Sequence, residues 1–268
     1  MTGDASDRYN INSIVRACSI LRILATDNEP LRVGEIAKRM GLDRTTAYRI
    51  VVTLENCGFL EKKPGTKEYR LGVGSFEVGS AYLRATDLYS VARPAMIELS
   101  SRVQEAVHWA ILSEGQSVCI DKIESPRGLG TTSKIGRASP LHVSSVGKVL
   151  LAFQKDETRE HVLQSMELTQ YTVRTITSMD ALKEELERTR RRGYCTTFGE
   201  GEIDMACVAG PVFDHANNLI AGLSIGGPAH RMNNPETMNQ MIREMTAATR
   251  QISEKMGCQN FPAFEEAA

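Results

Sequence analysis

The run Ser145-Val-Gly-Lys148 is the part of this sequence that comes nearest to a catalytic motif. A serine three residues before a lysine is the S-x-x-K pattern of penicillin-recognising acyl enzymes, in which the serine is the nucleophile. Those enzymes also carry Ser-Asp-Asn and Lys-Thr-Gly motifs, and this chain contains neither. Because a four-residue match arises by chance, we do not predict an acyl enzyme from it.

Two glycine-containing runs match nucleotide-binding motifs only in part. Gly147-Lys148 is followed by Val149, where a phosphate-binding loop needs serine or threonine, and the preceding glycine lies at the wrong spacing. In Gly72-Val-Gly74-Ser-Phe-Glu-Val-Gly79, Glu77 occupies the third glycine position of a dinucleotide-binding fingerprint. We therefore predict no cofactor.

The cysteines and histidines are not spaced for metal binding, a disulfide framework or nucleophilic catalysis. No C-x-x-C pair occurs, no histidine lies at ligand spacing beside a cysteine, and no histidine has a serine or cysteine partner in a catalytic arrangement. We expect most of the thiols to fill small spaces in the core, in a reducing cytoplasm. The residues concerned are Cys18, Cys57, Cys119, Cys195, Cys207, Cys258, His108, His142, His161, His215 and His230.

Residues 44–49 have side chains suited to DNA recognition. Polar and basic groups of this kind reach phosphates and base edges in a major groove. An ordinary helical hairpin with a solvated basic face is the alternative interpretation. The side chains concerned are Arg44, Thr45, Thr46, Tyr48 and Arg49.

Residues 33–52 favour DNA binding, because they predict the two helices of a helix-turn-helix in one register. Ala37 is small enough for two helices to cross closely, and Gly41 can adopt the left-handed conformation of the turn between them. Asp43 is expected to cap the second helix. The residues of the buried seam repeat at helical spacing and are Ile36, Met40, Ala47, Ile50 and Val51.

A β-hairpin is predicted directly after the second helix, with Gly58 as the cap of that helix. Its strands are residues 59–63 and 68–71. Pro64-Gly65 lies at the turn between them, where proline presets one φ and glycine supplies a positive one. Such a hairpin is the wing of a winged helix-turn-helix.

The tip of this wing is basic, because Lys62, Lys63 and Lys67 cluster where a wing meets the phosphate backbone. A further amphipathic helix at residues 11–26 is expected to cover the open side of the helix pair. The predicted DNA-binding domain therefore spans residues 11–73.

The charge distribution agrees with a two-part organisation. Residues 1–73 contain 12 Lys or Arg and 9 Asp or Glu, a net charge of +3, and the rest of the chain has a net charge of −4. A weakly basic head on an acidic body is typical of a DNA-reading domain joined to another domain. Without an apolar run of about 18 residues or a signal peptide, we expect a cytoplasmic protein.

Residues 74–90 predict a linker helix with an apolar side that pairs with a second subunit. Because the positive charge of the head is modest, we expect tight binding to need at least two heads on one DNA site. The apolar residues of the predicted linker helix are Phe76, Val78, Tyr82, Leu83 and Leu88.

Residues 91–258 predict a separate domain of mixed helices and strands. One antiparallel sheet with helices packed on it is the economical architecture, so the fold class is α+β. We predict helices at 91–103, 156–164, 178–192 and 235–256, and a further helix that ends near residue 153. The predicted strands are at 106–113, 117–124, near Thr131, and at 194–198, 206–213 and 219–225.

The chain resembles the IclR family of bacterial transcription regulators over residues 11–257. The resemblance implies a GAF-like C-terminal domain that binds a small molecule, usually an organic acid or catabolic intermediate. It also implies homodimers, often paired into homotetramers, and a structural role for Lys148. The motifs that carry it are the winged head, the linker helix, Gly136, Pro140-Leu141-His142, Gly147-Lys148, Arg192-Gly193-Tyr194, Cys207-Val-Ala-Gly-Pro211 and Leu223-Ser-Ile-Gly-Gly-Pro228.

The resemblance also implies which residues bind the effector. Family members often have an acidic residue at position 197 and a serine at position 226, so Thr197 and Gly226 depart from the pattern. For each serine the alternative is a helix cap or a surface position, and for Cys207 it is a packed core thiol. The implied pocket residues are Thr131, Ser144, Ser145, Val146, Thr197, Met205, Cys207, Ser224 and Gly226.

A physical argument for an acidic effector stands beside the resemblance. Ser144 and Ser145 precede a predicted helix, and the unpaired amides and dipole of a helix N-terminus favour an anion. We therefore predict a ligand-responsive repressor or activator that binds a pseudo-palindromic operator and controls a catabolic operon in response to a small organic acid. A small-molecule hydrolase with an accessory helical head and a DNA-binding protein without an effector are the alternatives.

Overall fold

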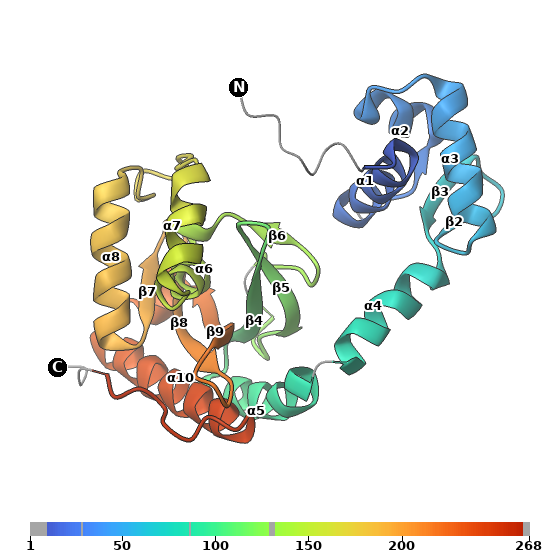
Figure 1. The fold of residues 1–268 in the computed structure, drawn as a ribbon. Coiled ribbons are helices and arrows are strands. Elements are labelled where there is room, and N and C mark those ends of the chain that lie inside the picture. Colours follow the sequence, from blue (N-terminus) through green and yellow to red (C-terminus); the bar gives the residue numbers. More distant parts are fainter. Residues whose placement is uncertain (1–9, 28, 86, 129–131, 265–268) are drawn as a thin grey trace. The chain divides into compact units, whose positions relative to one another are not determined.

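The computed structural model describes residues 10–264 apart from 28, 86 and 129–131 (Figure 1). The chain forms two compact units, which divide between Thr86 and Asp87. The first contains the predicted DNA-binding head, and the second contains the larger sheet.

The first unit is a winged helix-turn-helix, as the sequence predicts. Its three strands form an antiparallel sheet in the order β1-β3-β2. The elements are α1 (Asn12–Asp27), β1 (Leu31–Arg32), α2 (Val33–Met40), α3 (Arg44–Asn56), β2 (Leu60–Lys62), β3 (Glu68–Leu71) and α4 (Val73–Ala85).

Local interactions set the register of the two central helices. Gly41 ends α2 with a φ of 62°, the left-handed conformation expected of it. The carboxylate of Asp43 then accepts a hydrogen bond of 2.9 Å from the amide of Thr46, so α3 starts at Arg44. The core beneath them is formed by Ile20, Leu24, Leu31, Ile36, Val51, Leu54, Leu60 and Tyr69.

Three expectations for this part of the chain need correction. The cap of α3 is Cys57, and Gly58 follows it with a φ of 77°. Strand β1 was not predicted, because its two residues gain strand geometry only by pairing with β3. The linker helix ends at Ala85 and α5 (Asp87–Val103) begins before the predicted residue 91.

The early start of α5 has a packing reason. Tyr89 and Val91 pack against the core of the second unit, so this stretch belongs to that unit instead of to the linker. Of the predicted apolar residues of the linker, Phe76 and Val78 are exposed on α4. The side chains of Tyr82, Leu83 and Leu88 lie outside the described part of the structure.

The second unit contains a six-stranded antiparallel sheet in the order β6-β5-β4-β9-β8-β7. The predicted α+β class is therefore confirmed. Besides α5, the elements are β4 (Ala106–Ser113), β5 (Gln116–Ile123), β6 (Ala138–Ser139), the short 3-10 helix η2 (Leu141–Val143), α6 (Ser145–Ala152), α7 (Asp156–Ser165), α8 (Met179–Arg192), β7 (Cys195–Phe198), β8 (Met205–Phe213), β9 (Leu219–Pro228), α9 (Ala229–Met232) and α10 (Pro235–Lys255).

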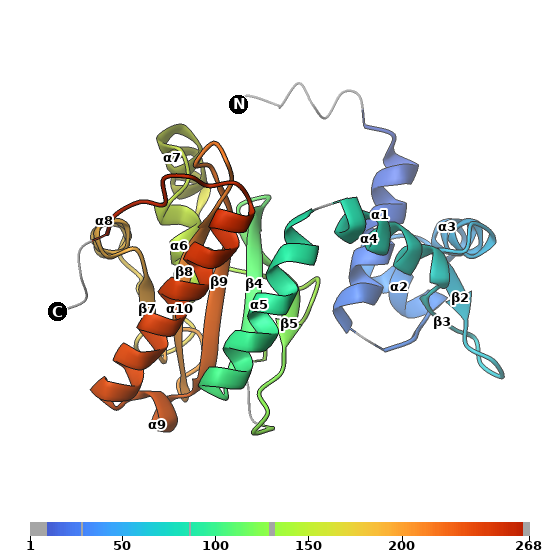
Figure 2. The ribbon, with the colours of Figure 1, turned by 90° about the horizontal axis from the view of Figure 1, so that it is seen from below.

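Helices cover both faces of this sheet. Figure 2 shows α5 and α10 lying side by side across the strands, and α6, α7 and α8 belong to the opposite layer (Figures 1 and 2). Because side chains alternate along a strand, Val107 and Trp109 of β4 enter the α5–α10 core, whereas His108 faces the α6 layer. The second face thereby receives the polar residues described below.

The segment before α6 differs from the prediction. The strand expected near Thr131 falls on residues outside the described part of the chain. The structure places a short strand, β6, at Ala138–Ser139 instead, paired with Ser117 and Val118 of β5. A two-residue strand carries no alternation for sequence analysis to detect.

Candidate DNA-binding surface and ligand pocket

A groove of about 950 Å³ lies between α3 and the wing of the first unit. Five of the eight predicted DNA contacts line it, and they come from both elements. Because Arg44, Thr45 and Tyr48 occupy adjoining positions on α3, they share one face toward the wing. The residues that line the groove are Arg32, Val33, Arg44, Thr45, Tyr48, Lys62, Gly65, Thr66, Lys67 and Tyr69.

The other three predicted contacts lie outside this groove. Thr46 is partly buried, and its amide is bound by the cap Asp43. Arg49 is exposed further along α3. Lys63 lies 3.8 Å from the carboxylate of Glu68, a weak surface ion pair.

The groove is positively charged, because Arg44, Lys62 and Lys67 have no carboxylate partner among the described residues. Sequence analysis missed Arg32, whose exposed guanidinium borders the groove 3.6 Å from Glu68. Its position immediately before α2 was the available signal, since residues at that helix start lie beside the wing.

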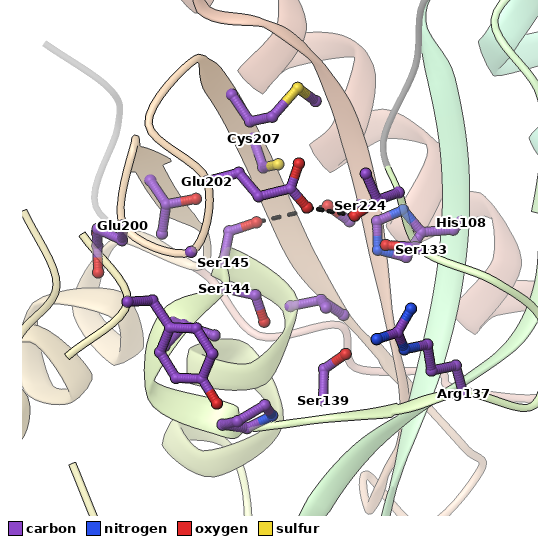
Figure 3. Close-up of a pocket in the computed structure, with 18 of the residues that line it drawn as sticks. His108, Ser133, Arg137, Ser139, Ser144, Ser145, Glu200, Glu202, Cys207 and Ser224 are labelled. Atoms are coloured by element: carbon purple, nitrogen blue, oxygen red, sulfur yellow. Dashed lines mark hydrogen bonds between the residues drawn. The ribbon is translucent and has the colours of Figure 1, made fainter. Parts of the chain in front are cut away.

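A second cavity, of about 420 Å³, lies in the second unit between the sheet and the start of α6 (Figure 3). Seven of the nine predicted pocket residues line it. They are Ser144, Ser145, Val146, Thr197, Met205, Cys207 and Ser224.

The remaining two predicted residues are not part of the cavity wall. Thr131 lies outside the described residues. Gly226 does not line the cavity, because it pairs with Ala106 on one side and Cys207 on the other and has no side chain to reach past the sheet.

The alternation of two neighbouring strands, β8 and β9, explains how these pocket residues converge. On β8, Met205 and Cys207 face the cavity while Ala206 and Val208 enter the α5–α10 core. On β9, Ser224 faces the cavity in the same way. A sheet face that is polar at one end and covered by helices elsewhere therefore forms the floor of a pocket.

The start of α6 forms the opposite wall. The hydroxyl of Ser144 caps the helix by accepting a hydrogen bond of 3.1 Å from the amide of Gly147. Ser145 is 1% exposed, and its hydroxyl oxygen lies 3.4 Å from that of Ser224 on β9. A Cβ on Gly147 would lie 2.2 Å from the carbonyl oxygen of Leu141, so glycine allows this helix to start against η2.

Lys148 is fully buried beside the pocket, and its ammonium lies 2.5 Å from the Glu200 carboxylate. Burial raises the pKa of Glu200, and the Lys148 charge opposes that rise. With Lys148 engaged in this way, the S-x-x-K run does not place a free amine beside Ser145.

His108 and Arg137 also line the pocket, and sequence analysis did not select either for it. Burial lowers the pKa of His108 to about 4, with a smaller contribution from the Lys122 charge, so the ring is neutral at pH 7. Its Nδ1 has no hydrogen-bond partner in the described structure. The alternation on the predicted strand at 106–113 was the signal for His108, and Arg137 adjoins the Gly136 motif.

Two acids from the loop after β7 complete the wall, and sequence analysis missed both. Glu202 accepts a hydrogen bond from Thr132, and Glu200 is paired with Lys148 as above. Burial raises the pKa of the Cys207 thiol to about 12, with further contributions from the charges of Glu202 and Glu200. The thiol is therefore a neutral group that lines the cavity, not a nucleophile.

No group of three or more potential metal ligands occurs in the part of the chain that the structure describes. Within the same residues, no helix has both the length and the apolar character to cross a membrane. A winged helix-turn-helix joined to a domain with a polar pocket defines the class, a DNA-binding protein with a second domain able to hold a small molecule.

Comparison with known proteins gives the family. The model of the IclR helix-turn-helix domain matches residues 13–64, and that of the bacterial transcriptional regulator IclR C-terminal domain matches residues 80–254. The HTH-type transcriptional regulator KdgR of Escherichia coli is 34% identical over 253 residues, which cover 94% of this chain and 95% of KdgR. The E. coli transcriptional repressor IclR is 30% identical over 224 residues, 83% of this chain and 82% of IclR.

Similar solved structures indicate the same family. The Thermotoga maritima IclR structure is 31% identical, with a TM-score of 0.74, and the match covers 92% of this chain and all of that one. An IclR homolog from Microbacterium hydrocarbonoxydans, complexed with 4-hydroxybenzoate, is 26% identical with a TM-score of 0.80 over 91% of this chain and 98% of that one. The chain belongs to the IclR family of bacterial transcription regulators. It is a DNA-binding regulator, and the prediction that it is not an enzyme is confirmed.

Proposed function

We propose that the protein controls a catabolic operon by binding a small organic acid in its C-terminal pocket, which changes its affinity for operator DNA. The observation that carries this proposal is the convergence of a helix start, a cation and buried hydroxyls on one cavity. The amides of Ser145 and Val146 lie in the first turn of α6, where no acceptor within the helix is available to them. Together with Arg137 they favour an anion.

Hydroxyl groups and an apolar wall fit the rest of a small acid. The contact of 3.4 Å between Ser145 and Ser224 is long for two hydroxyls, so either can turn toward a ligand oxygen. Val143, Val146 and Met205 provide apolar contact. The homolog from M. hydrocarbonoxydans, complexed with 4-hydroxybenzoate, supports an acid ligand for this family.

A chain of contacts connects the pocket to α5, the helix that follows the linker. The carbonyl of Arg137 accepts a hydrogen bond of 3.2 Å from Cys119 of β5. Two residues further along β5, the buried Asp121 forms an ion pair with Arg93 of α5. A ligand that moves Arg137 therefore acts on the strand that fixes α5. Coupling to DNA requires that the ligand bind the two head arrangements with unequal affinity.

Two heads on a pseudo-palindromic operator form part of the same proposal, with a homodimer that pairs through α4 and a homotetramer as a further assembly. Val73, Phe76 and Val78 expose apolar side chains on this helix, and Phe76 is 73% exposed. A two-fold axis in the protein demands matching half-sites in the DNA. Phe76→Lys should shift the sedimenting species toward the monomer and weaken operator binding, whereas an unchanged dimer would place the interface elsewhere.

The effector proposal is tested by titrating the full chain with short-chain acids in a calorimeter and measuring operator binding with and without each acid. Ser145→Asp should abolish acid binding by charge repulsion. Ser178→Asp is the matched control, because Ser178 is an exposed N-cap of α8 in the same domain. Ser145→Ala, which buries no charge, should weaken binding without loss of the fold. If Ser145→Asp binds the acid like the parent protein, the pocket assignment is wrong.

A further inference from the structure

We propose that the pocket recognises both ends of its ligand. It selects an acid that carries a hydroxyl or amino donor at the end opposite its carboxylate. This inference rests on the proposed function and adds a second point of recognition to it. The geometry behind it is the separation of charge around the cavity, with a basic side at Arg137 and an acidic side at Glu202 (Figure 3).

The basic side continues into a side chamber of about 50 Å³. Arg137, Ser133, Ser139 and Ser144 line both spaces, and Lys134 borders the chamber. A guanidinium among several hydroxyl donors matches the geometry of a carboxylate. His108, the pairing neighbour of Ser224 on β9, lines both spaces, is 5% exposed and has the unpartnered Nδ1 described above, so the wall contains a buried polar atom that a ligand can satisfy.

The acidic side is built from the loop between β7 and β8. Lys148 compensates the charge of Glu200, but Glu202 has no lysine or arginine partner among the described residues. Figure 3 shows the Glu202 carboxylate pointing into the cavity beside Ser145 and Ser224. Its hydrogen bond from Thr132 uses only part of its capacity, because a carboxylate has about four acceptor positions.

These charges discriminate between ligands that share a carboxylate and differ at the other end. A hydroxyl or amino group donates to Glu202 and satisfies it. A methyl group displaces water from the carboxylate without replacing its hydrogen bonds, which is unfavourable. A second carboxylate meets the like charge of the exposed Glu202 at short range and is rejected most strongly. Arg137 does not neutralise Glu202, because the two form no ion pair in the described structure.

The test uses unbranched acids of four, five and six carbons, each as the methyl-ended monocarboxylate, the ω-hydroxy acid and the dicarboxylate, titrated calorimetrically into the full chain at pH 7. We expect the hydroxy acid to bind at least tenfold more tightly than the methyl-ended acid of its length, and the dicarboxylate to bind weakest. Glu202→Gln keeps the shape of the side chain and removes its charge, so it should raise the affinity for the dicarboxylate at least tenfold.

Two further variants complete the design. Arg137→Gln should weaken binding of all three forms by a similar factor, because it removes the partner of the shared carboxylate. Glu184→Gln, exposed on α8, is the control and should change nothing. The proposal that the pocket recognises both ends of its ligand is wrong if the methyl-ended acids bind as tightly as the hydroxy acids, or if Glu202→Gln leaves the order of the three affinities unchanged. The acid-responsive function stands in either case. If none of the acids binds the parent protein, both are wrong.

Discussion

The ammonium of Lys148 lies 2.5 Å from the carboxylate of Glu200, and this buried pair joins the first turns of α6 to the loop that borders the pocket. The residues are 52 positions apart in the chain. Each of these buried charges is the ion-pair partner of the other, so removing one leaves the other in an environment that disfavours it. The pair thus holds two walls of the ligand site in register.

Lys148→Met should lower the free energy of unfolding by about 3–5 kcal/mol, the usual cost of leaving a buried charge unpaired. The double variant Lys148→Met with Glu200→Gln should lose clearly less than the sum of the single variants. Because the pKa of Glu200 is raised by burial above its ordinary 4.5, its protonated form is favoured in the folded state. The Lys148→Met defect should therefore be fully present above the raised pKa of Glu200 and shrink as the pH falls through that pKa toward 4.5. Urea denaturation at pH 5 and pH 8 measures both effects, and additive losses would contradict the coupling.

Acid should destabilise the C-terminal domain through His108. Its pKa is lowered from 6.5 to about 4, so the folded state disfavours the proton that the unfolded chain accepts. This contribution to stability is fully present above pH 6.5 and is lost progressively as the pH falls from 6.5 to about 4, and it amounts to about 3 kcal/mol. His108→Asn should flatten that part of the pH dependence. Parallel curves for parent and variant, measured by chemical denaturation from pH 7.5 to 4.5, would assign the acid sensitivity to other groups.

The six thiols should divide by exposure. Cys18 and Cys57 are exposed, whereas burial raises the pKa of Cys119 to about 11 and those of Cys195 and Cys207 to about 12. Since the thiolate is the reactive form, a disulfide reagent at pH 8 should modify two thiols quickly in the native protein and all six after denaturation. Rapid modification of Cys207, detected by peptide mass, would show that the pocket thiol is more accessible and acidic than its environment indicates.

The groove between α3 and the wing should contribute to DNA binding in two distinguishable ways. If Arg44 contacts a base edge, Arg44→Ala should cost about 1–3 kcal/mol on the operator and much less on unrelated DNA. Lys67→Ala should weaken binding to all sequences equally and reduce the slope of log affinity against log salt by about 1. Lys183→Ala, on α8 of the other unit, is the control. Fluorescence anisotropy with operator and scrambled duplexes decides the matter, and unchanged binding by both variants would remove the groove from the DNA interface.

The winged head could be read from the sequence because its signals are local. The turn at Gly41, the cap at Asp43 and the hairpin turn at Pro64-Gly65 each act within a few residues, and each shapes the backbone as expected. The differences within the head are the cap of α3, which is Cys57 instead of Gly58, and the short strand β1, which was not predicted. Those positions depend on packing against other parts of the chain.

Sequence analysis could predict the pocket residues that lie on regular elements or that the family resemblance implies. Ser145, Cys207 and Ser224 line the cavity because a helix start and alternating strands place them there. Gly226 shares the strand face of Ser224 but contributes no side chain. Alternation predicts a direction, and the reach of the side chain determines whether it meets the cavity.

Only the tertiary structure brought Arg137, Glu202 and His108 to the same cavity. They come from a loop, a second loop and a strand that are distant in sequence, and no short spacing relates them. The pairing of Lys148 with Glu200 likewise depends on α6 packing beside β7. Local signals set the conformation of each segment, because they act through neighbouring backbone groups. The charges of the pocket depend on which segments meet, and that is determined by burial of the whole core.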